Sequence, residues 1–303
     1  MLAFALALAS SLILPNKQAK LIPLYYQIVL GAFIVFLSVN CVIGLRSAKH
    51  AAKFFPKGQL FFALGLLFFA WDFFSAKTAI MPLPFYPGPT QIVQEAVADY
   101  KILLISSAHS LRLFALGFSS GIILGISTGI LISWYERWNY WLFPVIRVIG
   151  IIPAVALIPI AMGIFPSSLM VGSFLITMCL WFPIAYMTRS GIANINKAYF
   201  ETARTLGANE SWLIWRVAVP GALPSIFTGV STGIALSFAT LVVSEMVGAR
   251  AGLGWYLNWA KGWSVYSKVY ASIFVMGIEF ALILRGVGAI QSKLLAWQKG
   301  LVK

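Results

Sequence analysis

The sequence predicts an all-α protein that crosses a membrane several times, and three observations support that class. Of its 303 residues, 60% are hydrophobic and 10% are charged, whereas soluble domains carry roughly 25% charged residues. Apolar runs long enough to cross a bilayer recur along the whole chain. These runs are continuous, whereas a transmembrane β-barrel would show ~10-residue segments of alternating hydrophobicity. The composition therefore predicts a bundle of membrane helices.

Seven apolar runs are candidate spans, because a helix of ~20 residues crosses ~30 Å of hydrocarbon at ~1.5 Å per residue. They are residues 21–45, 59–80, 110–133, 139–163, 168–190, 221–247 and 269–290. Residues 1–14 are apolar but short, and are compatible with part of an eighth span or with an interfacial segment. They lack the basic start and the cleavage site of a secretory signal.

The basic residues orient the chain. The net charge of +14 is compatible with an anionic partner such as nucleic acid, or with the positive-inside bias of bacterial membrane proteins. The basic residues gather in the loops 46–57 and 191–220 and in the C-terminal tail, which favours the second interpretation and no nucleic acid partner. Four spans separate the two loops, so both lie in the cytoplasm. Lys17 and Lys20 oppose this assignment, because it places them outside.

Two outer segments stand out. Residues 81–109 open with closely spaced prolines and continue as an amphipathic segment that Thr90 can cap as a helix at the outer membrane surface. Residues 248–268 are rich in Gly and Trp.

The cytoplasmic loop 191–220 predicts two short helices. Asn196 can cap the first helix and Gly207 is the residue expected just past its end. Asn209 can cap the second helix, with Glu210 favourably placed in its first turn. Pro220 is expected to stop the second helix and to open the next span. The pattern is compatible with a rigid elbow presented to the cytoplasm, or with an ordinary connector.

The spacing of this loop favours the elbow. It resembles the EAA motif of binding-protein-dependent importer permeases, which reads Glu-Ala-Ala, three residues, Gly, nine residues and Ile-x-Leu-Pro. The matching positions are Glu201, Ala203, Gly207, Val217, Val219 and Pro220. Thr202 replaces the middle Ala, and Val replaces the Ile and the Leu.

The resemblance extends from about Pro82 to Leu295. Pro87-Gly88-Pro89-Thr90, Ser244-Glu245-Met246 and Gly252-Leu253-Gly254 look like the nitrate, sulfonate, taurine and bicarbonate branch of that family. The resemblance implies a type I ABC importer permease core of about six transmembrane helices, plus one or two extra N-terminal helices, in the bacterial inner membrane.

The implied organisation has three parts. Residues 1–58 are an N-terminal extension with a basic cytoplasmic loop, residues 59–295 are the permease core, and residues 296–303 are a cytoplasmic tail. The resemblance assigns the coupling to an ATPase to one group of residues in the elbow. They are Glu201, Thr202, Ala203, Arg204, Leu206, Gly207, Ala208, Asn209 and Pro220. Glu201 lies one turn before Arg204, a spacing compatible with an ion pair.

The implied partners follow from the same family. They are ATP-binding-cassette ATPase subunits, a periplasmic or lipid-anchored substrate-binding protein, and a second permease with which the chain forms a dimer. The chain has no phosphate-binding loop of the form G-x-x-x-x-G-K-[ST], so we expect it to bind no cofactor, while the ATPase binds ATP and Mg²⁺. The implied substrate is a small anion such as nitrate, a sulfonate, taurine or bicarbonate.

The sequence argues against two other functions that polytopic membrane proteins perform. An ion-coupled secondary transporter would use membrane carboxylates, but Asp72, Glu245 and Glu279 are few and the elbow would have no purpose. A membrane enzyme would need catalytic or metal-ligating clusters, and the two histidines and two cysteines do not form one. We therefore expect no catalytic residue and no metal site.

Polar residues within the spans are candidates for the substrate pathway or a gate. They are Glu245, Met246, Glu279 and Arg147. The carboxylates are also compatible with buried hydrogen bonds that fix helix packing. Arg147 could bind an anion or pair with a carboxylate, and we favour the pairing.

A ridge of small residues recurs at every fourth position of the span 110–133. It comprises Gly117, Gly121, Gly125 and Gly129. Such a ridge allows another helix to approach closely, within the subunit or at a dimer seam. A substrate path along the ridge is the alternative.

Overall fold

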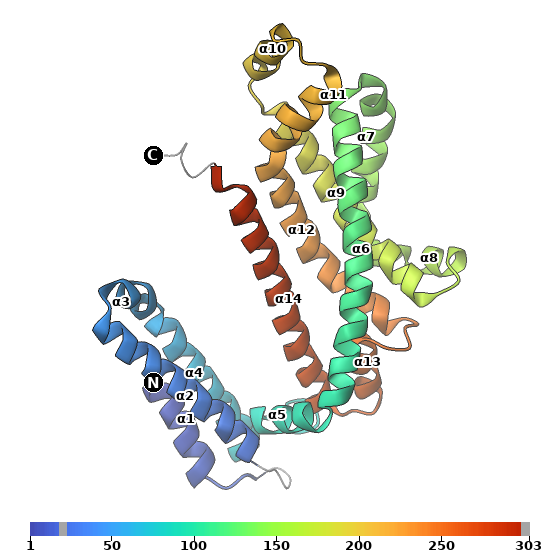
Figure 1. Ribbon diagram of the computed structural model, residues 1–303. Helices are drawn as coiled ribbons and strands as arrows, with labels where there is room; N and C mark the ends of the chain where they lie inside the picture. The colour runs from blue at the N-terminus through green and yellow to red at the C-terminus, as the bar shows by residue number, and fades with distance from the viewer. Residues whose placement is uncertain (18–22, 298–303) are drawn as a thin grey trace. The chain divides into compact units, whose positions relative to one another are not determined.

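A computed structural model describes residues 1–17 and 23–297, and Figure 1 shows their helices. The start of the first predicted span, Lys20 and positions 298–303 of the predicted tail lie outside the described residues. The α-helices are α1 (Leu2–Ile13), α2 (Leu24–Arg46), α3 (Ala48–Phe54), α4 (Gly58–Asp72), α5 (Pro89–Ala98), α6 (Tyr100–Trp134), α7 (Glu136–Ile151), α8 (Ile158–Ile164), α9 (Ser168–Ala193), α10 (Lys197–Thr205), α11 (Glu210–Leu213), α12 (Val219–Met246), α13 (Leu253–Gly262) and α14 (Tyr266–Leu294). The described residues contain no strand, which confirms the all-α class.

Six helical segments are long and apolar enough to cross a membrane, and one bent pair of helices passes the same test together. The six are Leu24–Arg46, Ala48–Lys77, Tyr100–Trp134, Ser168–Ala193, Glu210–Met246 and Tyr266–Leu294, and the bent pair is Glu136–Ile151 with Ala154–Ile164. Each matches one predicted span in order.

The chain forms two compact units. Unit 1 comprises Met1–Leu103 and Leu257–Phe274, and unit 2 comprises Leu104–Tyr256 and the segment that begins at Val275. In unit 1, helix α1 packs against α2 and α4, with Phe4 and Ala7 fully buried. The 12 residues of α1 extend about 18 Å, which is too short to cross the bilayer alone.

Unit 2 is built on three long helices, α6, α9 and α12. A side chain added at Gly117, Gly121 or Gly125 of α6 would lie 2.6 Å from Ile176, Leu180 or Ile184 of α9, respectively. Both series advance by four residues in the same direction, so α6 and α9 run parallel. Between α9 and α12 the close positions are Gly172 with Ser244 and Gly191 with Ser225, so α12 runs antiparallel to α9.

The parallel arrangement of α6 and α9 determines how the bent pair crosses the membrane. The chain leaves α6 at its cytoplasmic end and enters α9 at the outer end, so α7 and α8 together must carry it back across. The pair is therefore one broken span rather than a loop that returns to its starting side, which brings the crossings among the described residues to seven.

The fourth predicted span, 139–163, is correct in position but wrong in being continuous. The helix axis turns by 98° between α7 and the segment Ala154–Ile164. Ile152 is extended (φ −77°, ψ 121°), because a residue before proline avoids the helical region and Pro153 has no N–H to continue the helix.

The start of the third span is also corrected. Helix α6 begins at Tyr100 rather than near 110, and a separate helix α5 precedes it, ending at Ala98. Thr90 does not cap α5, because Gly88 occupies the N-cap and Pro89 the first turn. The Thr90 hydroxyl instead donates a hydrogen bond to Asp72 over 3.3 Å.

The helix that follows Asn209 does not stop at Pro220. A π-helical turn, Ile214–Ala218, joins α11 to α12, and Pro220 lies in the first turn of α12. Proline lacks only an N–H there, and the wider π turn adjusts the preceding backbone. Helix α12 therefore continues directly into the elbow.

Candidate functional site

The elbow comprises residues 196–220, and local contacts fix its shape. The Asn196 side chain accepts a hydrogen bond from the N–H of Ala198 over 3.0 Å, and the Asn209 side chain accepts one from Trp212 over 2.8 Å. Both caps were predicted from sequence. Gly207 has φ +86°, a left-handed conformation that glycine adopts without steric cost. The turn between α10 and α11 is therefore defined by its own residues.

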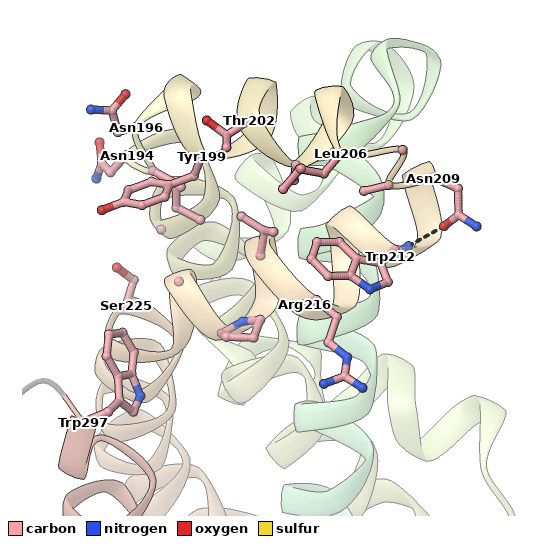
Figure 2. Close-up of a pocket in the computed structure, with 18 residues that line it drawn as sticks. Asn194, Asn196, Tyr199, Thr202, Leu206, Asn209, Trp212, Arg216, Ser225 and Trp297 are labelled. Carbon is pink, nitrogen blue, oxygen red and sulfur yellow. Dashed lines mark hydrogen bonds between the residues drawn. The ribbon is translucent and has the colours of Figure 1, made fainter.

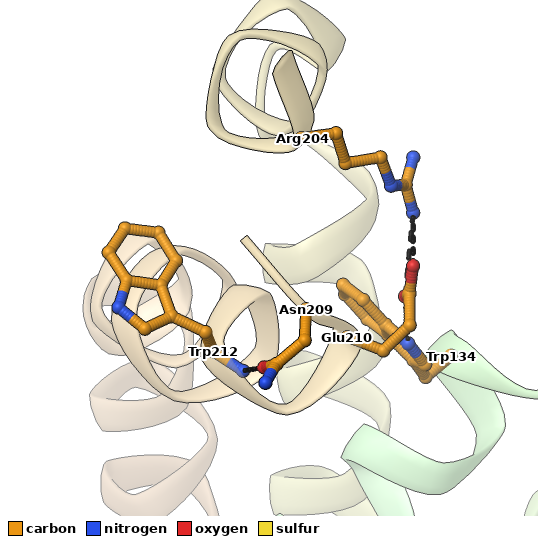
Figure 3. Close-up of polar contacts among 5 residues, drawn as sticks. All are labelled: Trp134, Arg204, Asn209, Glu210 and Trp212. Carbon is orange, nitrogen blue, oxygen red and sulfur yellow. Dashed lines mark hydrogen bonds and ion pairs between the residues drawn. The ribbon is translucent and has the colours of Figure 1, made fainter. Parts of the chain in front are cut away.

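An ion pair closes the turn and fastens it to helix α6 (Figure 3). Arg204 of α10 lies 3.2 Å from Glu210 of α11, and the Trp134 indole N–H donates to Glu210 over 3.0 Å. The expected pairing of Arg204 with Glu201 is wrong, because Arg204 turns to the carboxylate across the turn. Both partners are exposed, so the ion pair contributes only about 0.2–1 kcal/mol to stability. The bond from Trp134 connects the turn to a helix that lies 76 residues away in sequence.

The motif residues divide between a buried and an exposed side. Ala203 is buried, so a small residue is needed beneath α10, while Glu201 and Thr202 are exposed. Leu206 is 83% exposed at the turn, and Tyr199 and Trp215 are 67% and 61% exposed. Large apolar side chains are therefore exposed at several positions of the elbow.

A cavity of about 1160 Å³ opens under the elbow (Figure 2). Its walls include the motif residues Thr202, Ala203, Leu206, Gly207, Ala208, Asn209 and Pro220. The sequence did not single out its other polar and aromatic members, Asn194, Tyr199, Arg216, Ser225 and Trp297. These residues come from α10, α12, the π turn and the residues after α9 and α14. No single stretch of sequence therefore predicts the cavity.

The outer end of unit 2 holds a second cluster, formed by Ser110, Glu245, Leu253 and Gly254. Glu245 is 2% exposed and accepts hydrogen bonds from the Ser110 hydroxyl (3.0 Å) and the Gly254 N–H (2.8 Å). Ser110 in turn accepts one from the Leu253 N–H over 2.9 Å. Glu245 thus joins α12 to α6 and to the start of α13, where the helix dipole favours a carboxylate. The sequence did not identify Ser110.

The motif Gly252-Leu253-Gly254 fits closely around this carboxylate. Gly252 has φ +125°, and a side chain at either glycine would collide with Glu245. Leu253 between them is 1% exposed. Glu245 and the two glycines are therefore parts of one structure, in which the chain from Gly252 to Gly254 packs directly against the carboxylate.

Two of the other predicted pathway residues lie near the Glu245 cluster, since Met246 is the next residue in sequence and Glu279 is close enough to Glu245 to interact with it electrostatically. Glu279 is half-buried on α14 and forms a hydrogen bond with Ser107 of α6, while Met246 is the last residue of α12. Arg147 is exposed on α7, and within residues 1–17 and 23–297 no carboxylate pairs with it. The pairing that the sequence suggested for Arg147 is therefore not observed in the described chain.

The glycine ridge packs against α9 within the subunit. Gly129 adds a contact with Thr188 to the three described above, and Thr177 donates a hydrogen bond to the Gly117 carbonyl over 3.3 Å. The backbones of α6 and α9 approach closely along the whole ridge, which leaves no room for a substrate there.

Buried charges in unit 1 fasten the N-terminal extension. The Lys77 ammonium donates to the Leu14 carbonyl and to the Asn16 side chain, each over 2.7 Å. Asp72 is 1% exposed and accepts from Thr90. These bonds join the end of α1 and the start of α5 to the last turns of the span Ala48–Lys77. In the described parts of the chain, no group of three or more His, Cys, Asp or Glu is placed to hold a metal ion.

The helix arrangement and the elbow define a polytopic inner-membrane protein of the permease type. The family model described as "Binding-protein-dependent transport system inner membrane component" matches residues 121–294, more than half of the chain. The chain belongs to this family. Family membership and the membrane-spanning helices establish it as a multi-pass membrane protein.

Several curated relatives are similar over parts of their length. The formylaminopyrimidine transport permease protein ThiX of Halalkalibacterium halodurans is 31% identical over 140 residues, which cover 46% of this chain and 56% of ThiX. The bicarbonate transport system permease protein CmpB of Synechococcus elongatus is 33% identical over 126 residues, 42% of this chain and 45% of CmpB. The chain thus matches about half the length of these relatives.

Solved structures show the same fold. A chain of the inward-facing MetNI methionine ABC transporter aligns with a TM-score of 0.54 at 20% identity, covering 63% of this chain and 96% of that one. A chain of an amino acid ABC transporter aligns with a TM-score of 0.53 at 16% identity, covering 70% and 97%. The described fold is therefore that of ABC transporter permeases.

Proposed function

We propose that this chain is the membrane-spanning subunit of an ATP-driven importer, and that it couples to a separate ATPase through the elbow. The observation that carries this proposal is the geometry of the elbow. Two capped helices meet at Gly207 and present Leu206 beside an open cavity. This surface fits a partner protein rather than a small molecule, because its exposed side chains are large and apolar.

The elbow is attached to three long helices, which suits it to transmit force. It follows α9 directly, continues through the π turn into α12, and contacts α6 through Glu210 and Trp134. A rigid-body movement of a docked ATPase would therefore move α6, α9 and α12 together. Two copies of the chain would form the pathway, and an external binding protein would deliver the substrate to its outer side.

The proposed substrate is a small solute, with an anion of the nitrate, sulfonate, taurine or bicarbonate type as the specific hypothesis. The similarity to CmpB, whose name refers to bicarbonate, supports an anion. ThiX is named for formylaminopyrimidine, and the glycine betaine/carnitine/choline permease OpuCD of Bacillus subtilis is 35% identical over 107 residues. In this proposal the chain binds no cofactor, and ATP and Mg²⁺ belong to the ATPase.

The proposal is tested by purifying the tagged chain from its own membrane and reconstituting it in proteoliposomes with the co-purified ATPase and the binding protein. We expect ATP hydrolysis that rises when the loaded binding protein is added, together with uptake of labelled solute. Changing Leu206 to Asp should remove the ATPase, because a charge would replace the apolar contact. Uptake by the chain alone, driven by an ion gradient, would contradict the proposal.

A further inference from the structure

Helix α7 has one side packed in the protein and one side that bears an unpaired arginine. On the packed side, Ile146 is 1% exposed, and the Phe143 ring lies 4.1 Å beneath the Arg189 guanidinium of α9. On the opposite side, Tyr140, Val148 and Ile151 are 72%, 59% and 76% exposed, and Arg147 is exposed among them. Residues 140, 144, 147, 148 and 151 follow one helical face.

Arg147 lies deep in the membrane. The start of α7 carries an aromatic belt that includes Trp138 and Trp141, and such belts mark the membrane interface. Arg147 follows Trp138 by nine residues, or about 14 Å along the helix axis, which is close to the middle of a hydrocarbon core ~30 Å thick. From that depth its side chain cannot easily reach either interface.

This face is unsuited to lipid for two further reasons. Pro144 has no N–H, so the carbonyl of Tyr140 one turn earlier loses its helical partner. Helix α7 then ends at Ile151 within the membrane, where the Ile152 N–H donates to the Ile149 carbonyl and the other carbonyls of the last turn have no donor within the helix. Backbone of this kind at membrane depth is tolerated only against protein or water, and an unpaired arginine there faces a protein interior or a water-filled path.

We propose that the α7 face formed by Tyr140, Pro144, Arg147, Val148 and Ile151 lines the translocation pathway, and that Arg147 attracts the permeating anion. A guanidinium is the side chain best suited to planar oxyanions, because it presents five N–H donors in a fixed geometry. In the described chain no carboxylate neutralises its charge. The proposal rests on the proposed function in that it requires a pathway, but its test needs neither the ATPase nor the substrate.

The test measures water access and local charge with thiol reagents. Cys41 and Cys179 are first changed to Ala, and single cysteines are then introduced as Arg147→Cys, Ile151→Cys and Val35→Cys. Val35 is 62% exposed in the middle of α2, so it is the matched position expected to face lipid. We expect the membrane-impermeant reagents to modify positions 147 and 151, in intact cells or in inverted vesicles, and not position 35.

The local charge is measured as the ratio of two rates of cysteine modification in the Ile151→Cys variant. The anionic sulfonatoethyl and the cationic trimethylammonioethyl methanethiosulfonates are compared, so that changes in thiol reactivity cancel. Removing a unit charge one helical turn away should lower the anion-to-cation ratio about tenfold in the Arg147→Gln variant. Arg147→Lys should preserve the ratio, and so should Arg137→Gln, which removes an exposed charge at the start of the same helix.

Two outcomes would overturn the proposal while leaving the proposed function intact. Cysteines at 147 and 151 that react no faster than the cysteine at 35 would show that this face meets lipid or a sealed protein contact. An unchanged ratio in Arg147→Gln would show that the arginine does not attract anions in the pathway. If Arg147→Gln does not accumulate in the membrane, Arg147→Ala is measured in its place, and the same tenfold fall is expected. A tenfold fall in Arg147→Lys, despite the retained charge, would equally contradict the proposal.

Discussion

Gly207 is the position in the elbow where backbone conformation alone restricts the side chain. A side chain there would meet no heavy atom within 4 Å, so any cost of substitution comes from the φ of +86°. A β-branched residue pays about 1–2 kcal/mol in this region, whereas Asn tolerates it. Changing Gly207 to Val should therefore leave the protein inserted but lose the ATPase, or its stimulation by the loaded binding protein.

The matched control for this prediction is Gly207→Asn, which adds a side chain but keeps the left-handed turn accessible. We expect it to retain most of the ATPase. The measurement is co-purification of the ATPase with the tagged chain, together with the rate of ATP hydrolysis. A Gly207→Val complex that stays intact and transports at the wild-type rate would show that the elbow is only a connector.

Glu245 connects three helices through one carboxylate oxygen. Changing it to Ala would leave the Ser110 hydroxyl and the Gly254 N–H buried without an acceptor, at a cost of about 2–4 kcal/mol. We expect the melting temperature in detergent to fall by about 4–8 °C. Glu245→Gln keeps an oxygen in place and should melt near the wild type.

The glutamine variant also separates packing from gating at Glu245. If Glu245→Gln melts normally and retains substrate-stimulated ATP hydrolysis, the residue acts through its hydrogen bonds. Normal melting with lost stimulation would instead assign the negative charge a role in a gate.

At the scale of the helices, the glycine ridge of α6 sets the distance to α9. A Cβ atom at Gly121 would lie 2.6 Å from the Cβ of Leu180, so even Gly121→Ala must push the helices apart. We expect a loss of stability of about 1–3 kcal/mol, seen as a lower melting temperature and as aggregation in size-exclusion chromatography. Gly31→Ala is the control, because Gly31 lies within α2 with no atom in reach of an added methyl group.

The control should be neutral or stabilising by up to about 1 kcal/mol, since Ala favours a helix over Gly. Equal melting temperatures for Gly121→Ala and Gly31→Ala would contradict the close packing of α6 on α9.

The elements show which features local sequence can predict. The caps at Asn196 and Asn209 and the turn at Gly207 depend on neighbours within a few residues, and all three were predicted. Two other contacts join residues far apart in sequence, so no local pattern predicts them. Glu210 and Trp134 are 76 residues apart, and Ser110 and Glu245 are 135 residues apart. Apolar residues continue on both sides of Pro153, so hydropathy alone predicts no bend there, although Ile152-Pro153 is itself a signal for a helix break.

At the scale of the whole molecule, the order of the spans followed from hydropathy and charge, but the number of crossings depended on α7 and α8. Apolar composition alone does not distinguish a broken span from a loop that returns to the same side. The parallel contacts of α6 with α9 decide the question, and they can be recognised only when both helices are placed in space. The sequence predicted the glycine spacing on α6 but not its partner, since many apolar residues recur at similar intervals.

This topology predicts the side on which each loop is labelled. In the variant without Cys41 and Cys179, cysteines at positions 57 and 209 should react from the cytoplasm, and cysteines at 166 and 258 from the outside. Position 166 is decisive, because it follows α8 and is exposed. A returning loop would place position 166 in the cytoplasm and would reverse the orientation of the later spans relative to the earlier ones. The comparison is made with a cysteine at position 135, which lies between α6 and α7. Labelling of 135 and 166 from the same side would contradict both the broken span and the parallel order of α6 and α9, while labelling from opposite sides requires α7 and α8 to cross the bilayer together despite their 98° bend.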